Sequence, residues 1–189
     1  MKGLYTLFIL IFILLGCTEK LNETQSQILT IQNFLQLTIP AHYQFIKGQG
    51  IDSDVHYIFS DKKDTILVEY GRKGIINDLH DSPVPVFSLD KKAWVVKSLG
   101  REPTEEDVLF SEFPEEDFEQ RIFQKNFSMY DTINNIIVKV VQPKRVGNGI
   151  TGINIPKLKN GMSLSISGQN LDSVTHLTLL EVFKSLRYK

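Results

Sequence analysis

The stretch Met162-Ser-Leu-Ser-Ile-Ser-Gly168 is followed closely by Leu171-Asp-Ser-Val-Thr-His-Leu-Thr-Leu-Leu-Glu-Val-Phe-Lys-Ser-Leu186. In the first segment apolar residues alternate with serines, which predicts a half-buried strand whose hydroxyl face points to solvent. In the second segment, apolar residues at Leu171, Val174, Leu177, Leu180 and Phe183 recur every three residues, and the stripe is broadened by Leu179, Val182, Phe183 and Leu186. This spacing predicts an amphipathic helix over about residues 171–187, capped by Asp172 or Ser173 and packed across one face of a sheet.

Strand patterns also dominate the chain before this segment. Residues 60–64 read as a turn that joins two of these strands into a hairpin. The regular alternation of strands and helices that is typical of a doubly wound fold is missing. The sequence therefore predicts an α+β fold with a mostly antiparallel sheet and a terminal helix. Besides residues 162–167, the predicted strands are 35–39, 55–59, 66–70, 93–99, 121–127, 136–141 and 151–155.

The N-terminus has the pattern of a secretory signal. A basic start is followed by an apolar block over residues 4–15 and then by Gly16-Cys17. The block is too short to span a bilayer, which takes about 20 apolar residues. Leu14-Leu-Gly16-Cys17 resembles the lipobox of bacterial prolipoproteins. The resemblance implies cleavage before Cys17, acylation of Cys17, and a chain anchored to a membrane of the bacterial envelope, the outer membrane if the source is diderm.

The prolipoprotein resemblance sets the predicted domain boundaries. Residues 1–16 are predicted to be the signal peptide, and residues 17–33 the lipidated cysteine with a polar tether. Residues 34–189 are then expected to form a single domain, because 189 residues leave room for one ordinary domain.

Three short stretches of the predicted domain resemble known proteins. Leu37-Thr-Ile-Pro-Ala-His-Tyr-Gln-Phe45 is similar to the opening strand of PsbP-like domains, and Val182-Phe-Lys-Ser-Leu186 is similar to the end of their final helix. Gly50-Ile-Asp-Ser-Asp-Val55 resembles a segment of uncharacterised Bacteroidota lipoproteins. The PsbP-like resemblance implies a binding or assembly module, with no catalytic residue to carry over.

Composition restricts the classes of function. The chain has 21 basic and 22 acidic residues, a formal charge of −1, which argues against a dedicated nucleic-acid binder. Its single cysteine excludes an intrachain disulfide and any metal site built from several cysteines. Apolar residues make up 42% of the chain, enough for a buried core.

One segment differs from the rest in charge. Residues 102–120 hold nine acids and no Lys or Arg, whereas the remainder of residues 17–189 carries a formal +7. One interpretation is a solvated insertion whose phenylalanines attach it to the body. The other is an exposed docking loop, in which aromatic residues supply contact energy and acids steer a basic partner. The predicted contact residues are Phe110, Phe113, Glu115, Glu116, Asp117 and Phe118.

Several motifs suggest chemistry, but their surroundings do not fit it. Gly147-Asn-Gly-Ile-Thr-Gly152 matches a dinucleotide fingerprint but runs into a strand pattern instead of a helix. Asp52-Ser-Asp54 begins like a calcium loop, yet Tyr57 and Lys63 stand where Gly and Glu belong. Gly161-Met-Ser163 lacks the second glycine and the strand–helix corner of a nucleophile elbow. The sequence therefore predicts no catalytic residue, metal ligand, cofactor or nucleotide site.

Two functions stay open at this point. The first is a lipid-anchored, non-catalytic binding or assembly module of the bacterial envelope, with an envelope protein as partner. The second is an envelope enzyme, such as a hydrolase, whose carboxylates meet only on folding. A deep pocket with convergent acids or histidines would favour the enzyme, and an exposed aromatic surface would favour the module.

Overall fold

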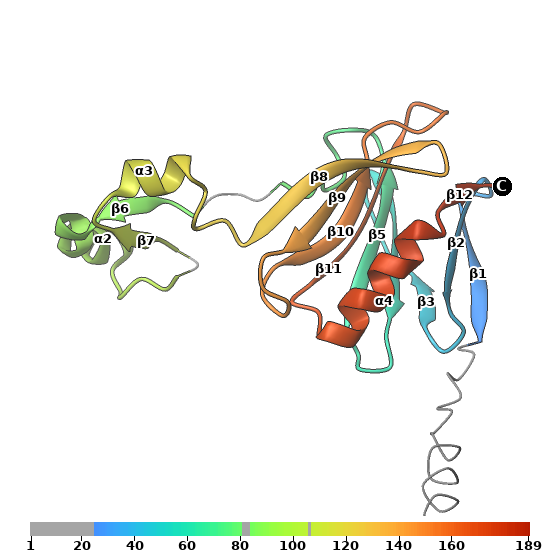
Figure 1. The fold of residues 1–189 in the computed structure, drawn as a ribbon, viewed down its shortest axis with the longest axis horizontal. Coiled ribbons are helices and arrows are strands. Elements are labelled where there is room, and N and C mark those ends of the chain that lie inside the picture. Colours follow the sequence, from blue (N-terminus) through green and yellow to red (C-terminus); the bar gives the residue numbers. More distant parts are fainter. Residues whose placement is uncertain (1–24, 81–83, 106) are drawn as a thin grey trace, which may run out of the picture.

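The computed structural model describes residues 25–80, 84–105 and 107–189. The predicted signal peptide and the lipid attachment site, with Gly16 and Cys17, lie outside these residues. The described chain has two regions, which Figure 1 shows side by side. We call residues 25–80 and 125–189 the body, and residues 84–124 the arm, which projects from one end of the body.

The body contains a seven-stranded sheet in which every neighbouring pair of strands is antiparallel. Residues 60–64 form the turn between its strands β4 (Ser53–Phe59) and β5 (Thr65–Gly71), as predicted, where Ser60 Oγ accepts a hydrogen bond from the Asp64 N–H at 3.1 Å. The predicted mostly antiparallel α+β fold is confirmed. Across the sheet the strands are β3 (Gln44–Lys47), β4 (Ser53–Phe59), β5 (Thr65–Gly71), β11 (Ser163–Gln169), β10 (Ile150–Ile155), β9 (Ile136–Pro143) and β8 (Asn126–Ile133).

One face of this sheet is covered by a helix and by a second, smaller sheet. The helix is α4 (Ser173–Lys184), and the small sheet has the order β1 (Ser26–Ile31), β2 (Leu35–Pro40) and β12 (Arg187–Tyr188). Figure 1 shows α4 lying across the strands, with β1 and β2 beside it. These elements enclose one apolar core. Its fully buried members include Leu35, Leu37, Ile66, Val68, Val138, Ile153, Leu164, Ile166 and Leu186.

The domain begins before residue 34, where the predicted tether was expected to end. β1 pairs with β2 from Ser26↔Pro40 to Ile31↔Leu35, and its Leu29 and Ile31 are buried in the core. These two side chains alternate with the exposed Ile28 and Thr30, which is the burial pattern of a strand with one covered face. The sequence prediction was wrong here because the polar residues around them hid a short edge strand.

The terminal helix forms as predicted, and most of its predicted apolar stripe is buried. Asp172 is the cap, since its carboxylate accepts hydrogen bonds from the Val174 and Thr175 N–H groups at 2.7 and 3.0 Å. Val174 and Leu177, which were expected to face the core, are exposed. The buried face is formed by Leu179, Val182 and Phe183, as expected, together with Thr175 and His176. The centre of the buried face is therefore displaced from the residues that recur every three positions.

The serine face of β11 is buried, although it was expected to face solvent. Ser163, Ser165 and Ser167 are each less than a tenth exposed. The loop over residues 72–80 lies against this side of the sheet, because Asn154 Nδ2 donates to the Asn77 carbonyl at 3.3 Å and Lys139 Nζ to the Leu79 carbonyl at 3.1 Å. Both faces of the central strands are thus covered.

Two predicted strands are wrong, and both fall in or beside the arm. Residues 93–99 belong to helix α2 (Lys92–Leu99), and residues 121–125 precede β8, which begins at Asn126. Gly100, with φ of 69°, ends α2 in the left-handed conformation that favours glycine, and this is a helix stop signal in the sequence. The arm's other elements are β6 (Val86–Ser88), the 3-10 turn η1 (Leu89–Lys91), β7 (Leu109–Ser111) and α3 (Pro114–Glu119).

Candidate functional site

The arm has a very small core of its own. β6 and β7 form a parallel pair, with Phe87 opposite Phe110, and the rings of Phe87 and Trp94 lie 5.9 Å apart. Among the arm's described apolar residues only Val95 and Val108 are buried. Chains of about 40 residues rarely fold on so little buried apolar area. The arm therefore has more apolar surface than it can cover by itself.

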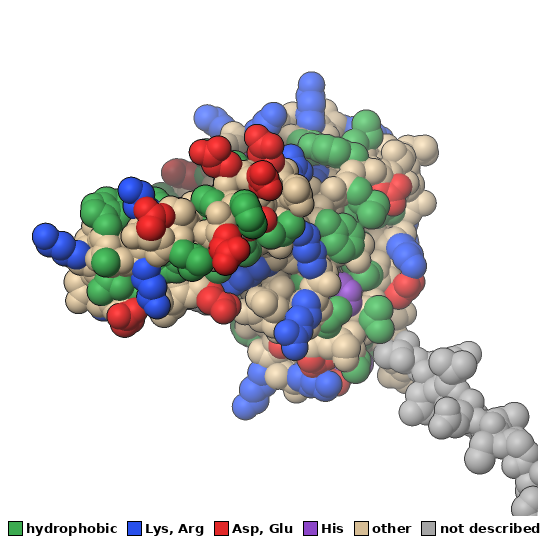
Figure 2. Space-filling view, turned by 60° about the vertical axis from the view of Figure 1, so that its left-hand side comes forward, with side chains coloured by type: hydrophobic (Ala, Val, Ile, Leu, Met, Phe, Trp, Pro, Cys, Tyr) green, Lys and Arg blue, Asp and Glu red, His purple; other side chains and the backbone are tan. Residues whose placement is uncertain are grey.

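Large apolar side chains are exposed over the whole arm. Trp94 is 59% exposed, Phe113 60% and Phe118 55%. Leu89, Leu99 and Ile122 are also exposed. Single exposed apolar residues are ordinary, but a group of this size on one projection is typical of an interaction surface. Figure 2 shows hydrophobic and acidic side chains interleaved on the arm.

The structure separates the six predicted contact residues into two groups. Phe113, Phe118, Glu115 and Glu116 are exposed, so they are free to meet a partner. Phe110 is half-buried in the β6–β7 pair. Asp117 also has a structural role, because its carboxylate accepts a hydrogen bond from the Ser111 hydroxyl, and Ser111 Oγ accepts one from the Phe113 N–H at 2.9 Å.

The predicted boundaries of the acidic excursion were too narrow. The projection covers residues 84–124, which hold ten acids and five bases, a formal −5 instead of −9. Residues 17–83 and 125–189 together carry 15 bases and 12 acids, a formal +3. The charge separation between arm and body is therefore real but smaller than predicted. Within the arm, Lys91, Lys92 and Lys97 lie on or beside α2, and the acids are concentrated around α3.

An ion pair organises the chain between α2 and β7. The Arg101 guanidinium donates two hydrogen bonds of 2.7 Å to the Asp107 carboxylate, which also accepts from the Thr104 N–H at 2.8 Å. The hydrogen bonds from Arg101, followed by those from Thr104, hold the pKa of Asp107 well below its usual range. Two of the segment's charges are thus used internally, and the acids available to a partner are mainly those of α3.

Sequence reasoning missed Trp94 as a candidate contact residue. The run Ala93-Trp-Val-Val96 was interpreted as a strand because it is rich in aromatic and β-branched residues. Gly100 was the available signal for a helix C-terminus, and a helix there exposes Trp94 while burying Val95.

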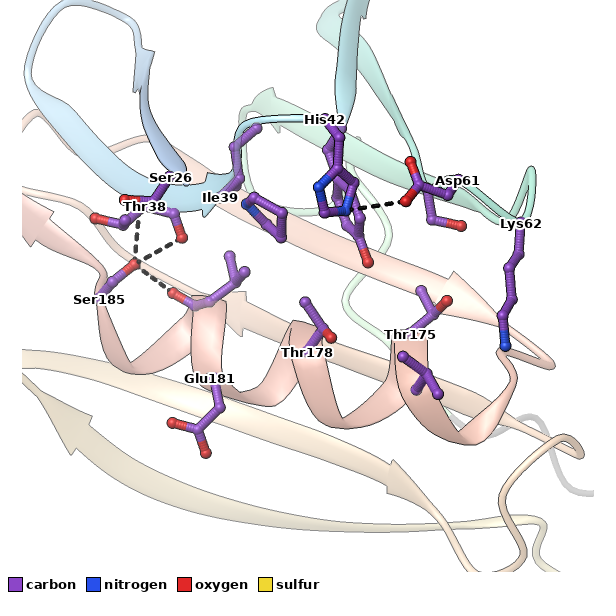
Figure 3. Close-up of a pocket in the computed structure, with 15 residues that line it drawn as sticks. Ser26, Thr38, Ile39, His42, Asp61, Lys62, Thr175, Thr178, Glu181 and Ser185 are labelled. Atoms are coloured by element: carbon purple, nitrogen blue, oxygen red, sulfur yellow. Dashed lines mark hydrogen bonds and ion pairs between the residues drawn. The ribbon is translucent and has the colours of Figure 1, made fainter. Parts of the chain in front are cut away.

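A second candidate site is an open groove of about 600 Å³ between α4, the end of β2 and the 60–62 turn. Figure 3 shows its residues. His42 Nε2 and Asp61 Oδ2 are 3.2 Å apart at its rim, and both side chains are largely exposed. Tyr43 forms part of the wall, which Thr175 and Thr178 also line. Burial raises the pKa of Tyr43 above its ordinary value.

The groove does not have the arrangement of a hydrolytic site. In the described part of the chain, His42 has an ion-pair partner in Asp61 but no hydroxyl at hydrogen-bond distance. Ser185 Oγ accepts from the Thr38 N–H at 2.7 Å and donates to the Val182 carbonyl at 2.6 Å, so it is engaged by backbone. Glu181 points away from His42 in Figure 3. Acids and histidines therefore do not converge there as general acid–base chemistry requires.

The buried histidine has a structural environment. His176 Nδ1 lies 2.7 Å from Thr151 Oγ1, and burial lowers the pKa of His176. His80 pairs with Asp78 at 3.5 Å, and both side chains are exposed. Residues 25–80, 84–105 and 107–189 contain no group of three or more His, Cys, Asp or Glu side chains placed to hold a metal ion.

Comparisons of the chain with protein-family models, with curated protein sequences and with solved structures found no match. The helices within the described ranges are all too short or too polar to cross a bilayer.

Proposed function

We propose that this protein is a lipid-anchored, non-catalytic binding or assembly module of a bacterial envelope, and that it contacts a protein partner through the arm. One observation carries the proposal: Trp94, Phe113 and Phe118 are more than half exposed on a projection that buries almost no apolar residue. Aromatic side chains supply most of the contact energy in many interfaces. Covering these three would also complete the small core of the arm.

The charges around the aromatic residues indicate the chemistry of the partner. Glu115 and Glu116 are exposed on α3, between Phe113 and Phe118. Such acids would increase the rate of association with a basic surface, and salt would weaken the effect. The partner is therefore a protein with an apolar patch bordered by Lys or Arg.

Site-specific photocross-linking in the native membrane tests the proposal. A photoreactive phenylalanine analogue replaces Trp94, Phe113 or Phe118 in turn. The same analogue at Ile51 or Leu177, which are exposed on the body, is the matched control. We expect one partner band from the three arm positions and none from the controls. Equal cross-linking from arm and body, or none from the arm, would contradict the proposal.

The lipid anchor rests on the N-terminal pattern and needs its own test. The apolar block followed by Gly16-Cys17 supports cleavage before Cys17 and acylation of the new N-terminus. Mass spectrometry of the membrane-bound protein should identify an acylated Cys17 as its first residue. Cys17→Ala should accumulate as uncleaved or mislocalised precursor. A membrane-bound chain that still begins with Met1 would overturn the anchor.

The body supports a PsbP-like interpretation of the fold only in general outline. Strand β2 ends at Pro40 and is followed by the buried Tyr43, and helix α4 buries Val182 and Phe183. Such domains serve as binding or assembly modules, in agreement with the proposed function.

A further inference from the structure

A second hollow, of about 740 Å³, lies on the other side of the seven-stranded sheet from α4. Its floor is formed by strand residues that alternate with those of the apolar core, as the two faces of a strand require. The loop over residues 73–80 forms one wall. Arg121 and Gln124, at the base of the arm, form another.

The floor of the hollow is polar. Asn154 of β10, Lys139 of β9 and Tyr130 of β8 lie side by side in register across three strands. Asn154 is buried, and Tyr130 is largely exposed. An amide, an ammonium group and a phenol thus line one row, whereas the opposite face of β9 and β10 carries core residues such as Val138 and Ile153.

The walls of the hollow are basic. Lys73, Arg121, Lys139 and Lys144 line it against a single acid, Asp78, a formal +3. None of these four cations forms an ion pair with a carboxylate in the described portion of the chain. Figure 2 shows Lys and Arg side chains on the body beside the arm.

Two of the cations are held in place by backbone. Lys139 Nζ donates to the Asp78 and Leu79 carbonyls at 3.0 and 3.1 Å, and Lys144 Nζ donates to the Arg121 carbonyl at 2.8 Å. Side chains that are already held in place lose less conformational entropy when a ligand binds than mobile side chains do. The positions of these two ammonium groups therefore favour a ligand whose anionic groups match them. Lys73 and Arg121 are exposed at the rim and are free to close on it.

We propose that this hollow binds an acidic oligosaccharide, a chain of sugars that carries carboxylate or phosphate groups. The volume lies within the range of small-ligand sites, about 300–1,000 Å³. The ammonium and guanidinium groups match carboxylate or phosphate oxygens. Asn154, Ser128 and Gln124 offer hydrogen bonds to sugar hydroxyls, and the exposed Tyr130 ring offers an apolar face to a sugar ring. The inference does not depend on the proposed function of the arm.

Isothermal titration calorimetry of the full chain in a zwitterionic detergent tests this inference. The probes are trigalacturonate, which carries carboxylates, maltotriose phosphate, which carries a phosphate, and maltotriose, which is neutral. We expect one or both acidic probes to bind, with an affinity that falls as salt rises, and maltotriose to bind at least about tenfold more weakly. The better acidic probe identifies the anionic group.

Two variants with equal loss of charge locate the binding. Lys73→Gln/Arg121→Gln removes the two rim cations, and Lys47→Gln/Lys157→Gln removes two exposed cations that do not line the hollow. We expect at least about a tenfold loss of affinity for the first and less than about twofold for the second. Thermal unfolding of both variants checks that they are folded, and Tyr130→Ala should weaken binding independently of charge.

Three results would overturn the inference. The first is that no acidic probe binds, or that maltotriose binds equally well. The second is that both charge variants lose affinity to the same degree. The third is a concentration-dependent dimer in sedimentation, dispersed by Lys73→Gln/Arg121→Gln or by Glu115→Gln/Glu116→Gln, because the hollow would then receive the acidic arm of a second copy.

Discussion

The body and the arm differ most in how they treat apolar residues. The body encloses a core of 22 buried residues between its sheets and α4. The arm buries Val95 and Val108 and leaves Trp94, Phe113 and Phe118 exposed. Burying apolar surface stabilises a fold by about 25 cal/mol per Å². The body can therefore be stabilised by its own core. The arm leaves most of its apolar surface exposed, where another molecule can cover it.

The charges differ in the same way. The arm carries a formal −5, and the rest of residues 17–189 carries +3. A basic surface and an acidic, aromatic projection on one molecule are suited to different ligands. The two proposals follow this difference, because the anion site is proposed for the basic hollow and the partner contact for the arm.

The largest expected effect is the loss of a core side chain from α4. Leu179 is 1% exposed, and Leu177 on the same helix is 61% exposed. We expect Leu179→Ala to lower the free energy of unfolding by about 3 kcal/mol, because it leaves a cavity in a closed core. Leu177→Ala should change it by less than about 0.5 kcal/mol. Urea denaturation measures both, and equal effects would mean that α4 packs on a different face.

Removal of the α4 cap should have a smaller effect than removal of Leu179. Asp172 accepts hydrogen bonds from two free N–H groups at the start of the helix and pairs with Lys62 at 3.2 Å. Asp172→Ala should lower the urea midpoint, while Asp172→Asn should retain most of it, since Asn caps helices about as well as Asp does. If the two variants were equally destabilised, the ion pair with Lys62 would be the main contribution instead.

A weaker effect is expected from pH. Burial lowers the pKa of His176, so the folded chain disfavours its protonation. As pH falls below about 6.5, the unfolded chain binds a proton that the folded chain does not, and stability therefore decreases. Burial also lowers the pKa of His56, which contributes in the same direction. Urea denaturation at pH values from 8 to 5 gives the free energy of unfolding as a function of pH. This free energy should depend less on pH in His56→Gln/His176→Gln than in the unmodified chain, and an equal dependence would contradict the assignment.

Deletion of the arm is expected to have the smallest effect on the stability of the body. Replacing residues 84–124 by a short Gly-Ser linker removes none of the 22 core residues. We expect the shortened chain to keep the cooperative urea unfolding of the body, with a free energy of unfolding within about 0.5 kcal/mol of that of the full chain. A chain that no longer folds would show that the arm is part of the body and not an addition to it.

The body was largely predictable from sequence because its strands alternate regularly. The alternation of Leu35, Leu37 and Ile39, and that of Met162, Leu164 and Ile166, follows the buried face directly. The burial of the serine face was not predictable, because it depends on the 72–80 loop, which packs there through Asn154 and Lys139 from distant strands. The local sequence pattern shows that a segment is a strand and which of its faces is apolar. It does not show whether another part of the chain covers the opposite face.

The arm was harder to predict for a physical reason. With so few buried residues it has no strong hydrophobic period, and local propensity misassigned Ala93–Leu99 as a strand. The exposed Phe113 and Phe118 were predicted as contact residues from their interleaving with acids, whereas Trp94 and the basic hollow required the folded chain. Lys73, Arg121 and the neighbouring Lys139 and Lys144 come from three separate parts of the sequence, and only the topology brings them together.

The affinity for the cross-linked partner tests the role of the arm most directly. The triple variant Trp94→Ser/Phe113→Ser/Phe118→Ser removes the exposed aromatic side chains, and Ile51→Ser/Leu177→Ser removes exposed apolar side chains from the body. Surface plasmon resonance with the purified partner should show at least about a tenfold loss of affinity for the arm variant and almost none for the body variant. Equal affinity of the arm variant and the unmodified chain would contradict the assignment of the arm as the contact site.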